Sequence, residues 1–226
     1  MDKERQTGDH ELLNQQELGG GQEGPLSPAL DLSVEALEKA GHSDFPGLFD
    51  ACMEKRRDWM RDSYDRVLPA GELIFNRFEK AKYLGFGEGS SIYDTSVVMG
   101  KITVGKNVWI GPYTILEGAN ASLKIGDFVA ISAGTCIYTH DSSRYFASGG
   151  KAEEKIGPVT IGSCTQIGTM CTVLCGVTIG SHCVIGAHSL VNQDIPDFSI
   201  AAGIPAKVIG HVVLNGDEVE FCYDSH

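Results

Sequence analysis

The stretch "VTIGSHCVIGAH", residues 177 to 188, indicates the architecture of this chain. Ile179 and Ile185 lie six residues apart, and each is followed by glycine. A period of six fits neither the 3.6-residue repeat of a helix nor the two-residue alternation of a strand. It is typical of a short strand followed by a turn, repeated along the chain.

The same six-residue period extends over about a hundred residues, from Ile92 to Val191. Counting in both directions from Ile179 finds fourteen aliphatic residues in phase, and glycine follows seven of them. The fifth residue of each unit is usually small or β-branched. The phase breaks once, between Leu116 and Ile125, where "EGANASLK" adds three residues. The in-phase residues are Ile92, Val98, Val104, Ile110, Leu116, Ile125, Ile131, Ile137, Ile161, Ile167, Val173, Ile179, Ile185 and Val191.

Three such units make one triangular coil of eighteen residues, with strands stacked at about 4.8 Å. One coil cannot bury its own faces, so coils must stack around a continuous core. Fourteen units predict between four and five coils. We therefore predict a mainly β fold, a parallel β-helix, over residues 86–210. A globular sheet protein with Ile-Gly pairs by chance is the alternative, and the length over which the phase holds disfavours it.

The segments outside the repeat differ in composition. Residues 1–30 contain no aromatic residue and end rich in glycine and proline, which predicts a disordered tail. Residues 31–85 contain helical patterns, including an amphipathic stretch at 47–68. We interpret them as a helical cap over the open end of the β-helix, in preference to an acceptor-binding or lipid-contacting module. Residues 211–226 are assigned as a C-terminal extension.

Composition restricts the classes of partner and compartment. The formal net charge is -12, and there is no basic stripe that could neutralise phosphates, which argues against nucleic acid as a partner. No apolar run approaches 18 residues, so no membrane span is predicted. The acidic N-terminus does not resemble a signal peptide. The seven cysteines include no CxxC pair, which is typical of a reducing, cytoplasmic location.

A polar loop interrupts the repeat between Ile137 and Ile161, where about eighteen residues leave the pattern without changing the phase. A loop that leaves a rigid scaffold is a common place for chemistry. His140 lies at its start, directly after a core unit. Acyl transfer from a thioester needs a base, hydrogen-bond donors for the oxyanion and a groove for the carrier. A histidine is a suitable base near neutral pH.

Two motifs resemble the hexapeptide-repeat acyltransferases. "IYTHDSSRYFASGG", followed by "PVTIG", and "DIPDFSIAAGIPAKVIG" are similar to the sugar, maltose, galactoside and xenobiotic O-acetyltransferases. The resemblance implies a left-handed β-helix, acetyl-CoA as co-substrate, and a homotrimer in which carrier and acceptor meet between neighbouring β-helices. Carried over by position, it implies that His140 is the general base. The residues in the family's coenzyme A positions are Thr169, Ala187, Asn192 and Lys207.

Two positions depart from the family pattern. Gln166 stands where the family often has tryptophan, and Asp141 follows His140 where many relatives have proline. Asp141 could orient the base or hold a turn, and we favour the turn. His182 and His188 occupy the fourth position of consecutive units, which lie on different faces. They should diverge, which is poor geometry for zinc, and no metal is expected.

Three functions remain open on the sequence. The first is an acetyl-CoA-dependent O-acetyltransferase that moves an acetyl group directly to a sugar hydroxyl in surface polysaccharide or glycoconjugate assembly, with His140 as general base. The second is an N-acetyltransferase for an amino sugar carried on a nucleotide. The third is a non-catalytic β-helix scaffold. The sequence does not reveal the sugar or the position that is acetylated.

Overall fold

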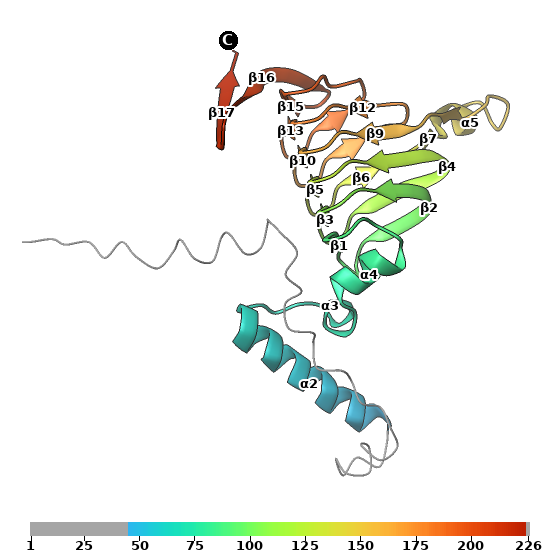
Figure 1. The fold of residues 1–226 in the computed structure, drawn as a ribbon. Coiled ribbons are helices and arrows are strands. Elements are labelled where there is room, and N and C mark those ends of the chain that lie inside the picture. The colour runs from blue at the N-terminus through green and yellow to red at the C-terminus, as the bar shows by residue number, and fades with distance from the viewer. Residues whose placement is uncertain (1–44, 225–226) are drawn as a thin grey trace, which may run out of the picture.

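The computed structural model describes residues 45–224. The predicted tail at 1–30 and the start of the predicted helical segment lie outside these residues. The described part opens with three helices, α2 (Phe45–Tyr64), α3 (Ala70–Ile74) and α4 (Arg77–Tyr83). The Asn76 side chain accepts hydrogen bonds from the backbone N–H groups of Phe78 and Glu79, so a new helix begins there. Helix α2 projects away from the rest of the molecule (Figure 1).

The strands after α4 wind into coils with three faces (Figure 1). The first face contains β1 (Ser91–Ile92), β3 (Trp109–Ile110), β5 (Ala130–Ile131), β10 (Gln166–Ile167), β13 (Val184–Ile185) and β15 (Ser199–Gly203). The second face contains the first halves of β2 (Val97–Val104) and β4 (Ile115–Ile125), then β6 (Cys136–Ile137), β11 (Thr172–Val173) and β14 (Leu190–Val191). The third face contains the second halves of β2 and β4, then β9 (Val159–Ile161) and β12 (Thr178–Ile179). All these strands pair in parallel.

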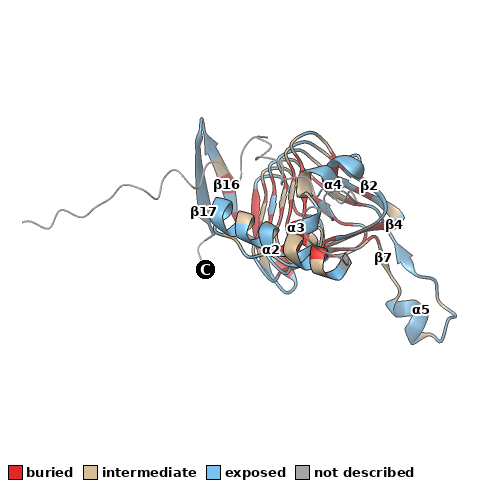
Figure 2. Cartoon of the chain, turned by 90° about the horizontal axis from the view of Figure 1, so that it is seen from below, coloured by how far each residue is buried: buried red, intermediate tan, exposed pale blue. Residues whose placement is uncertain are grey.

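The in-phase aliphatic residues form the core of the coils. Thirteen of the fourteen are buried, and Val98 is partly buried against them. The small residues at the fifth position are buried as well, as Thr135 and Cys171 illustrate. Figure 2 shows the buried positions recurring along the coils. The predicted mainly β fold, a parallel β-helix of hexapeptide repeats, is therefore confirmed.

The β-helix is longer than the predicted four to five coils. Six parallel strands, from β1 to β15, stack on the first face. The last coil was missed because it is shorter than eighteen residues: Ile195 follows Val191 after four residues and bridges to Ile179. Ala201 then pairs with Ile185. Counting only strict six-residue units therefore underestimates the number of coils when one corner is shorter.

The fourth position of the unit has a conformation that the sequence pattern did not indicate. Phe128, Cys164 and His182 occupy it with φ values of 54°, 57° and 56°. Such left-handed backbone is uncommon for residues other than glycine. Hydrogen bonds between successive coils hold it here, such as the 2.8 Å bond from the Phe128 N–H to the Lys106 carbonyl.

Helices α3 and α4 are attached to the first coil through two charged side chains. The buried Glu72 carboxylate accepts hydrogen bonds from the backbone N–H groups of Asp94 and Thr95, at 3.0 and 2.9 Å. The Lys80 ammonium donates to the carbonyls of Tyr93, Asp94 and Ser96, at 3.0, 2.8 and 3.0 Å. A capping role for these helices stays a prediction. Within residues 45–224, no helix combines the length and apolar character that crossing a bilayer requires.

Two hairpins extend from the coils. At the C-terminal end, β16 (Ala206–Asn215) and β17 (Glu218–Tyr223) continue the first face as antiparallel strands. The boundary predicted between residues 210 and 211 therefore falls inside β16. The second hairpin, here called the arm, contains β7 (His140–Asp141), α5 (Ser143–Ala147) and β8 (Lys155–Ile156). The arm projects sideways from the coils and is mostly exposed (Figure 2).

Candidate active site

The residues added in β4 directly follow a carboxylate, Glu117, and the N–H groups of Ala119 and Asn120 donate hydrogen bonds to it. The pairing of β4 with β2 shifts register between Gly100 and Ile102, so β4 bulges over β2. Gly100 has φ +80°, and a Cβ at this position would lie 2.3 Å from the Ala119 Cα. Only glycine fits under the bulge without strain. The short insertion thus remains within the wall of the β-helix.

Glu117 is buried and accepts several hydrogen bonds. Its Oε1 accepts from the backbone N–H of Ala119 at 2.7 Å. Its Oε2 accepts from both the N–H and the hydroxyl of Thr139, each at 2.8 Å. The same Oε2 lies 3.0 Å from Nδ1 of His140. Residues 117 and 140, far apart in sequence, are therefore held in direct contact.

The hydrogen bonds determine the charge of Glu117. Burial alone would raise the pKa of its carboxyl group, but the bonds from His140, Thr139 and Ala119 together lower the pKa to about 2. The carboxylate is therefore ionised at neutral pH and can only accept hydrogen bonds. Nδ1 of His140 must then carry the proton that it shares with Glu117. In a neutral imidazole ring, this leaves Nε2 as the free acceptor.

His140 lies at the root of the arm, where the coil ends and β7 begins. Its side chain is 31% exposed, so the ring can reach a bound molecule. Tyr138 stands edge-on to the imidazole, with ring centroids 6.5 Å apart. Fixed on one edge and exposed elsewhere, this ring has the arrangement that a general base needs.

No hydrogen bond or ion pair joins the Asp141 carboxylate to the imidazole among the described residues. Its Oδ1 accepts a hydrogen bond from the backbone N–H of Ser143 at 2.8 Å, at the start of α5. Hydrogen bonds to Ser143 lower the pKa of the Asp141 carboxyl group. These contacts correspond to the turn interpretation. The residue that holds His140 is Glu117, which the sequence reasoning did not select. Its signal was available, because an acidic residue follows Leu116 where glycine often stands and where the phase breaks.

Three of the four residues at the family's coenzyme A positions lie along one corner, between the first and second faces. Thr169 and Ala187 are eighteen residues apart and occupy the same place in successive coils, where the His188 N–H donates to the Thr169 carbonyl at 2.8 Å. Lys207 pairs with Ala202 in the β15–β16 hairpin, one coil further on. All three are exposed. Such an edge of small side chains with a lysine at its end fits a long carrier that bears phosphates.

The other positions lie elsewhere. Asn192 is exposed and follows β14 on the second face. His140 leaves the coil at the far edge of that face, between the second and third faces. Within one chain, the Thr169 corner and His140 are thus separated by the width of a face and do not converge. Gln166 is exposed on the first face.

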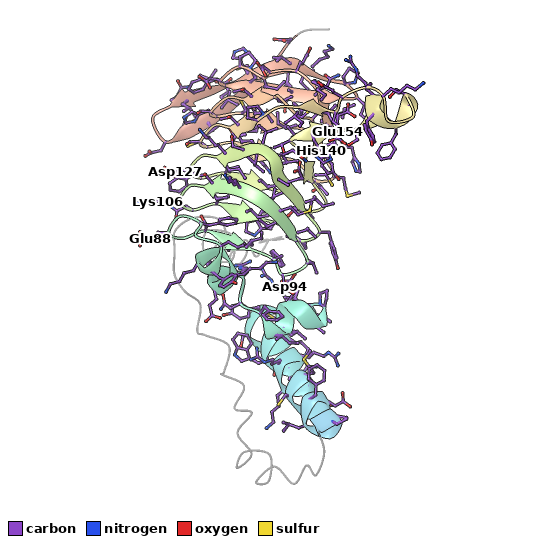
Figure 3. All side chains as sticks on the ribbon, turned by 90° about the vertical axis from the view of Figure 1, so that its right-hand side faces the viewer. Glu88, Asp94, Lys106, Asp127, His140 and Glu154 are labelled. Carbon is purple, nitrogen blue, oxygen red and sulfur yellow. The ribbon has the colours of Figure 1, made fainter. Side chains whose placement is uncertain are left out.

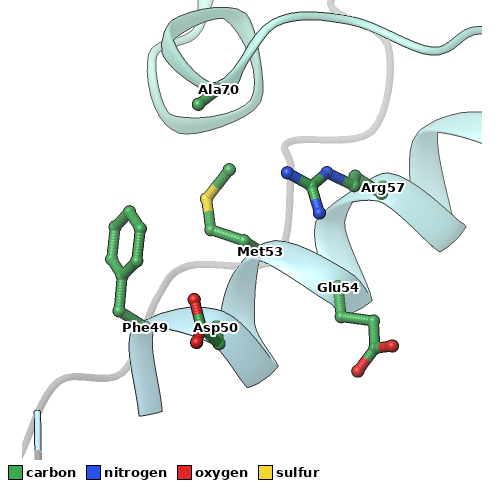
Figure 4. Close-up of a pocket in the computed structure, with 6 residues that line it drawn as sticks. All are labelled: Phe49, Asp50, Met53, Glu54, Arg57 and Ala70. Atoms are coloured by element: carbon green, nitrogen blue, oxygen red, sulfur yellow. The ribbon is translucent and has the colours of Figure 1, made fainter. Parts of the chain in front are cut away.

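The remaining features do not add to this site. A hollow of about 260 Å³ lies between α2 and α3, where Phe49 and Met53 point toward Ala70 (Figure 4). It is lined by helices and not by coils. His182 stacks on Phe198 with ring centroids 4.7 Å apart. Among the described residues, no three His, Cys, Asp or Glu side chains gather in a way that could hold a metal ion.

Comparison with known proteins identifies the repeat. Residues 158–193 match the family described as bacterial transferase hexapeptide (six repeats). A putative acetyltransferase of Staphylococcus aureus (strain Mu50) is 40% identical over 109 residues, which are 48% of this chain and 54% of that protein. The galactoside O-acetyltransferase of Escherichia coli K12 is 30% identical over 129 residues, 49% of this chain and 64% of that protein.

Among solved structures, a variant of AntD, an N-acyltransferase from Bacillus cereus in complex with dTDP and coenzyme A, is similar with a TM-score of 0.50. It is 25% identical, and the match covers 59% of this chain and 88% of that one. The predicted resemblance to hexapeptide-repeat acetyltransferases is thus confirmed. The chain spans about half the length of the first curated relatives that it matches.

Proposed function

We propose that this protein is an acetyl-CoA-dependent O-acetyltransferase whose acceptor is a sugar hydroxyl. The observation that carries the proposal is the contact between His140 Nδ1 and the buried, ionised Glu117 at 3.0 Å, at the root of an exposed arm. Because the ionised Glu117 accepts the Nδ1 proton, Nε2 of the partly exposed imidazole is left free to accept a proton from a bound acceptor, which supports a catalytic role. The similarity to the E. coli galactoside O-acetyltransferase supports a sugar acceptor.

The proposed reaction is a direct transfer. His140 Nε2 takes the proton from the acceptor hydroxyl as its oxygen attacks the carbonyl carbon of the thioester. The C–O bond forms, the C–S bond breaks, and the coenzyme A thiolate receives the proton from the imidazolium. Glu117 holds the ring and stabilises the positive charge that it acquires during the transfer. Neither a protein nucleophile nor a metal takes part.

The carrier is proposed to bind along the corner of Thr169 and Ala187, with Lys207 near its phosphates and Asn192 on the adjoining face. Because this corner and His140 do not converge in one chain, the proposal requires a second copy, and a homotrimer with closed three-fold symmetry meets the need. Light scattering should give three times the chain mass of 24.2 kDa. A stable, active monomer would exclude this arrangement. A role in surface polysaccharide or glycoconjugate assembly stays a prediction.

The second candidate is N-acetylation of an amino sugar linked to a nucleotide. The similarity to the N-acyltransferase AntD, in its complex with dTDP and coenzyme A, favours it. An amine that arrives already deprotonated needs the base less than a hydroxyl does. The two reactions therefore differ in how strongly they should depend on His140.

A free-thiol assay with acetyl-CoA separates the candidates. Neutral sugars and dTDP-linked amino sugars are offered in parallel to the wild type, to His140→Ala and to His211→Ala, an exposed histidine of β16 that serves as the matched control. We expect turnover of neutral sugars by the wild type and the control but not by His140→Ala. Turnover of the amino sugar alone would favour N-acetylation. Calorimetry that detects no acetyl-CoA binding by the wild type would exclude both candidates.

A further inference from the structure

The arm contains a hollow of its own, with a volume of about 480 Å³. This volume lies within the range of small-molecule sites, about 300–1,000 Å³. The hollow combines an aromatic ring, an aliphatic side chain and groups of both charges. Its lining residues are Tyr145, Gly150, Lys151, Ala152, Glu153, Glu154 and Ile156.

The hollow adjoins the candidate base. Ile156, one of its walls, is paired with His140 across the antiparallel β7–β8 ladder. Residues directly opposite each other in such a ladder have Cβ atoms about 4.5–5.5 Å apart and point to the same side. Figure 3 labels His140 and Glu154, which come from the two sides of the arm, and Glu154 directly precedes the paired strand residues Lys155 and Ile156. One wall of the hollow, Ile156, is thus the residue that faces His140 across the ladder.

Hydrogen bonds within the arm fix the shape of the hollow. The Ser142 hydroxyl donates to Glu154 Oε1 at 2.6 Å and joins the two sides of the arm. The Ser148 hydroxyl accepts from the N–H groups of Lys151 and Ala152, at 3.0 and 2.7 Å, and donates to the Tyr145 carbonyl at 2.9 Å. These bonds hold the two sides of the arm together, which limits the ordering cost of binding.

The chemistry of the lining matches a sugar. The Tyr145 ring and Ile156 are 41% and 53% exposed, and together they offer an apolar surface to the C–H face of a pyranose. Glu153 has no hydrogen bond or ion pair within residues 45–224, so both of its oxygens can accept hydrogen bonds from sugar hydroxyl groups. Two carboxylates against one ammonium, that of Lys151, give the lining a formal charge of -1. That charge disfavours a pyrophosphate.

We infer that this hollow is the acceptor subsite, and that it selects a neutral, polyhydroxylated sugar over a sugar linked to a nucleotide. The inference rests on the proposed function and makes it more specific. Tyr145 supplies the stacking surface and Glu153 the hydrogen-bond acceptors. Ile156 sets the position of the sugar relative to His140.

The test measures sugar binding directly, so that it does not depend on acyl transfer. Saturation-transfer NMR titrations with maltose, methyl β-galactoside and dTDP-4-amino-4,6-dideoxyglucose are run on the full chain and on three variants. These are Tyr145→Ala, Glu153→Gln and the control Tyr83→Ala, a 90% exposed tyrosine at the end of α4. The free-thiol assay is run on the same proteins.

We expect a neutral sugar to bind the wild type and the control, and to bind Tyr145→Ala at least about fivefold more weakly, the equivalent of about 1 kcal/mol. Glu153→Gln should weaken the neutral sugar less and should strengthen the nucleotide-linked one. Equal affinities of all four proteins for the neutral sugar, or binding of the nucleotide sugar alone, would overturn the inference. Sugar binding that depends on Tyr145 without any acetyl transfer would overturn the proposed function and would leave the hollow assigned as a sugar-binding site only.

Discussion

The two interruptions of the repeat differ in what the β-helix does with them. The three residues added after Leu116 stay in the wall, where β4 bulges over Gly100 and buries Glu117. The roughly eighteen residues added after Tyr138 leave the wall and form the exposed arm. The short insertion supplies a fixed, buried charge, and the long one supplies the accessible imidazole of His140 and a hollow beside it.

Length explains the difference. Three residues are too few to form a hairpin, so they are absorbed as an irregularity in a long strand, with the backbone still paired. Eighteen residues can satisfy their own hydrogen bonds as β7, α5 and β8, and the coil then resumes in phase at Ile161. The site arises because both interruptions emerge on one edge of the second face. Substitutions in the wall and in the arm should therefore have different effects on turnover and on stability.

Replacing His140 with alanine should have the largest effect. Loss of a general base typically lowers the rate by about 10²–10⁴-fold, and we expect turnover with the true acceptor to fall by that factor. The core should be unaffected because the imidazole is not an inward-facing group of the coil. Steady-state kinetics with acetyl-CoA measure the effect. Asparagine at 140 should behave like alanine, since an amide cannot accept a proton at neutral pH. Near-normal turnover in both variants would remove His140 from the role of base.

Replacing Glu117 with glutamine should lower turnover by up to about 10²-fold, the cost of misplacing a reacting group by about 1 Å. The Michaelis constant for acetyl-CoA should not change, because Glu117 is distant from the corner of Thr169. Glu72→Gln is the matched control, a second buried carboxylate that accepts backbone N–H bonds, from Asp94 and Thr95 of the first coil, and that has no bond to His140. It should reduce stability without reducing turnover. If both variants lost turnover equally, the role of Glu117 would be structural only.

The pH dependence of stability gives a second test of Glu117. The pKa of its carboxyl group falls from an ordinary 4.5 to about 2 on folding, so the charge stabilises the folded protein above pH 4.5. That contribution is lost as the pH decreases from about 4.5 to about 2. Denaturant unfolding should show the wild type more stable than Glu117→Gln at pH 7, with the difference shrinking over this acidic range. A difference that is constant with pH would contradict the lowered pKa.

Replacing one glycine in the wall and one in the arm with alanine should lower the free energy of unfolding by different amounts. Gly100→Ala adds a Cβ 2.3 Å from the Ala119 Cα at φ +80°, and strain of this kind costs on the order of 1–3 kcal/mol. Gly149→Ala in the arm has φ +66° but no atom within 4 Å of its Cβ, so it should cost less. The shift in the unfolding midpoint measures both. A larger loss for Gly149→Ala would show that the arm, not the bulge, is the more constrained region.

Replacing Asp141 with alanine should have the smallest effect. It removes one hydrogen bond from the Ser143 N–H in an exposed turn, where water can replace the lost acceptor. We expect faster hydrogen exchange of the Ser143 amide and turnover within about fivefold of the wild type, the equivalent of 1 kcal/mol. A loss as large as that of Glu117→Gln would mean that Asp141 also orients the base.

The sequence alone predicted the β-helix, its core residues and the place where the chain leaves it. These features are periodic, and an aliphatic residue every six positions can be buried in only one way. The sequence also indicated His140, which stands at the end of a regular unit. It did not indicate that Glu117 is the partner of His140, that the fourth position of the unit has positive φ values, or that a sixth strand stacks on the first face. Each of these depends on contacts between coils.

The tertiary structure determined what the interruptions do. A pattern shows that three residues have been added near Glu117, but it cannot show that the bulge points the carboxylate at Thr139 and His140, 22 and 23 residues away. Nor can it show that the predicted coenzyme A corner and His140 lie on opposite edges of one face. Stacked coils bring residues that are about eighteen positions apart in sequence next to each other. An insertion changes which residues become neighbours, and it does so where the candidate site lies.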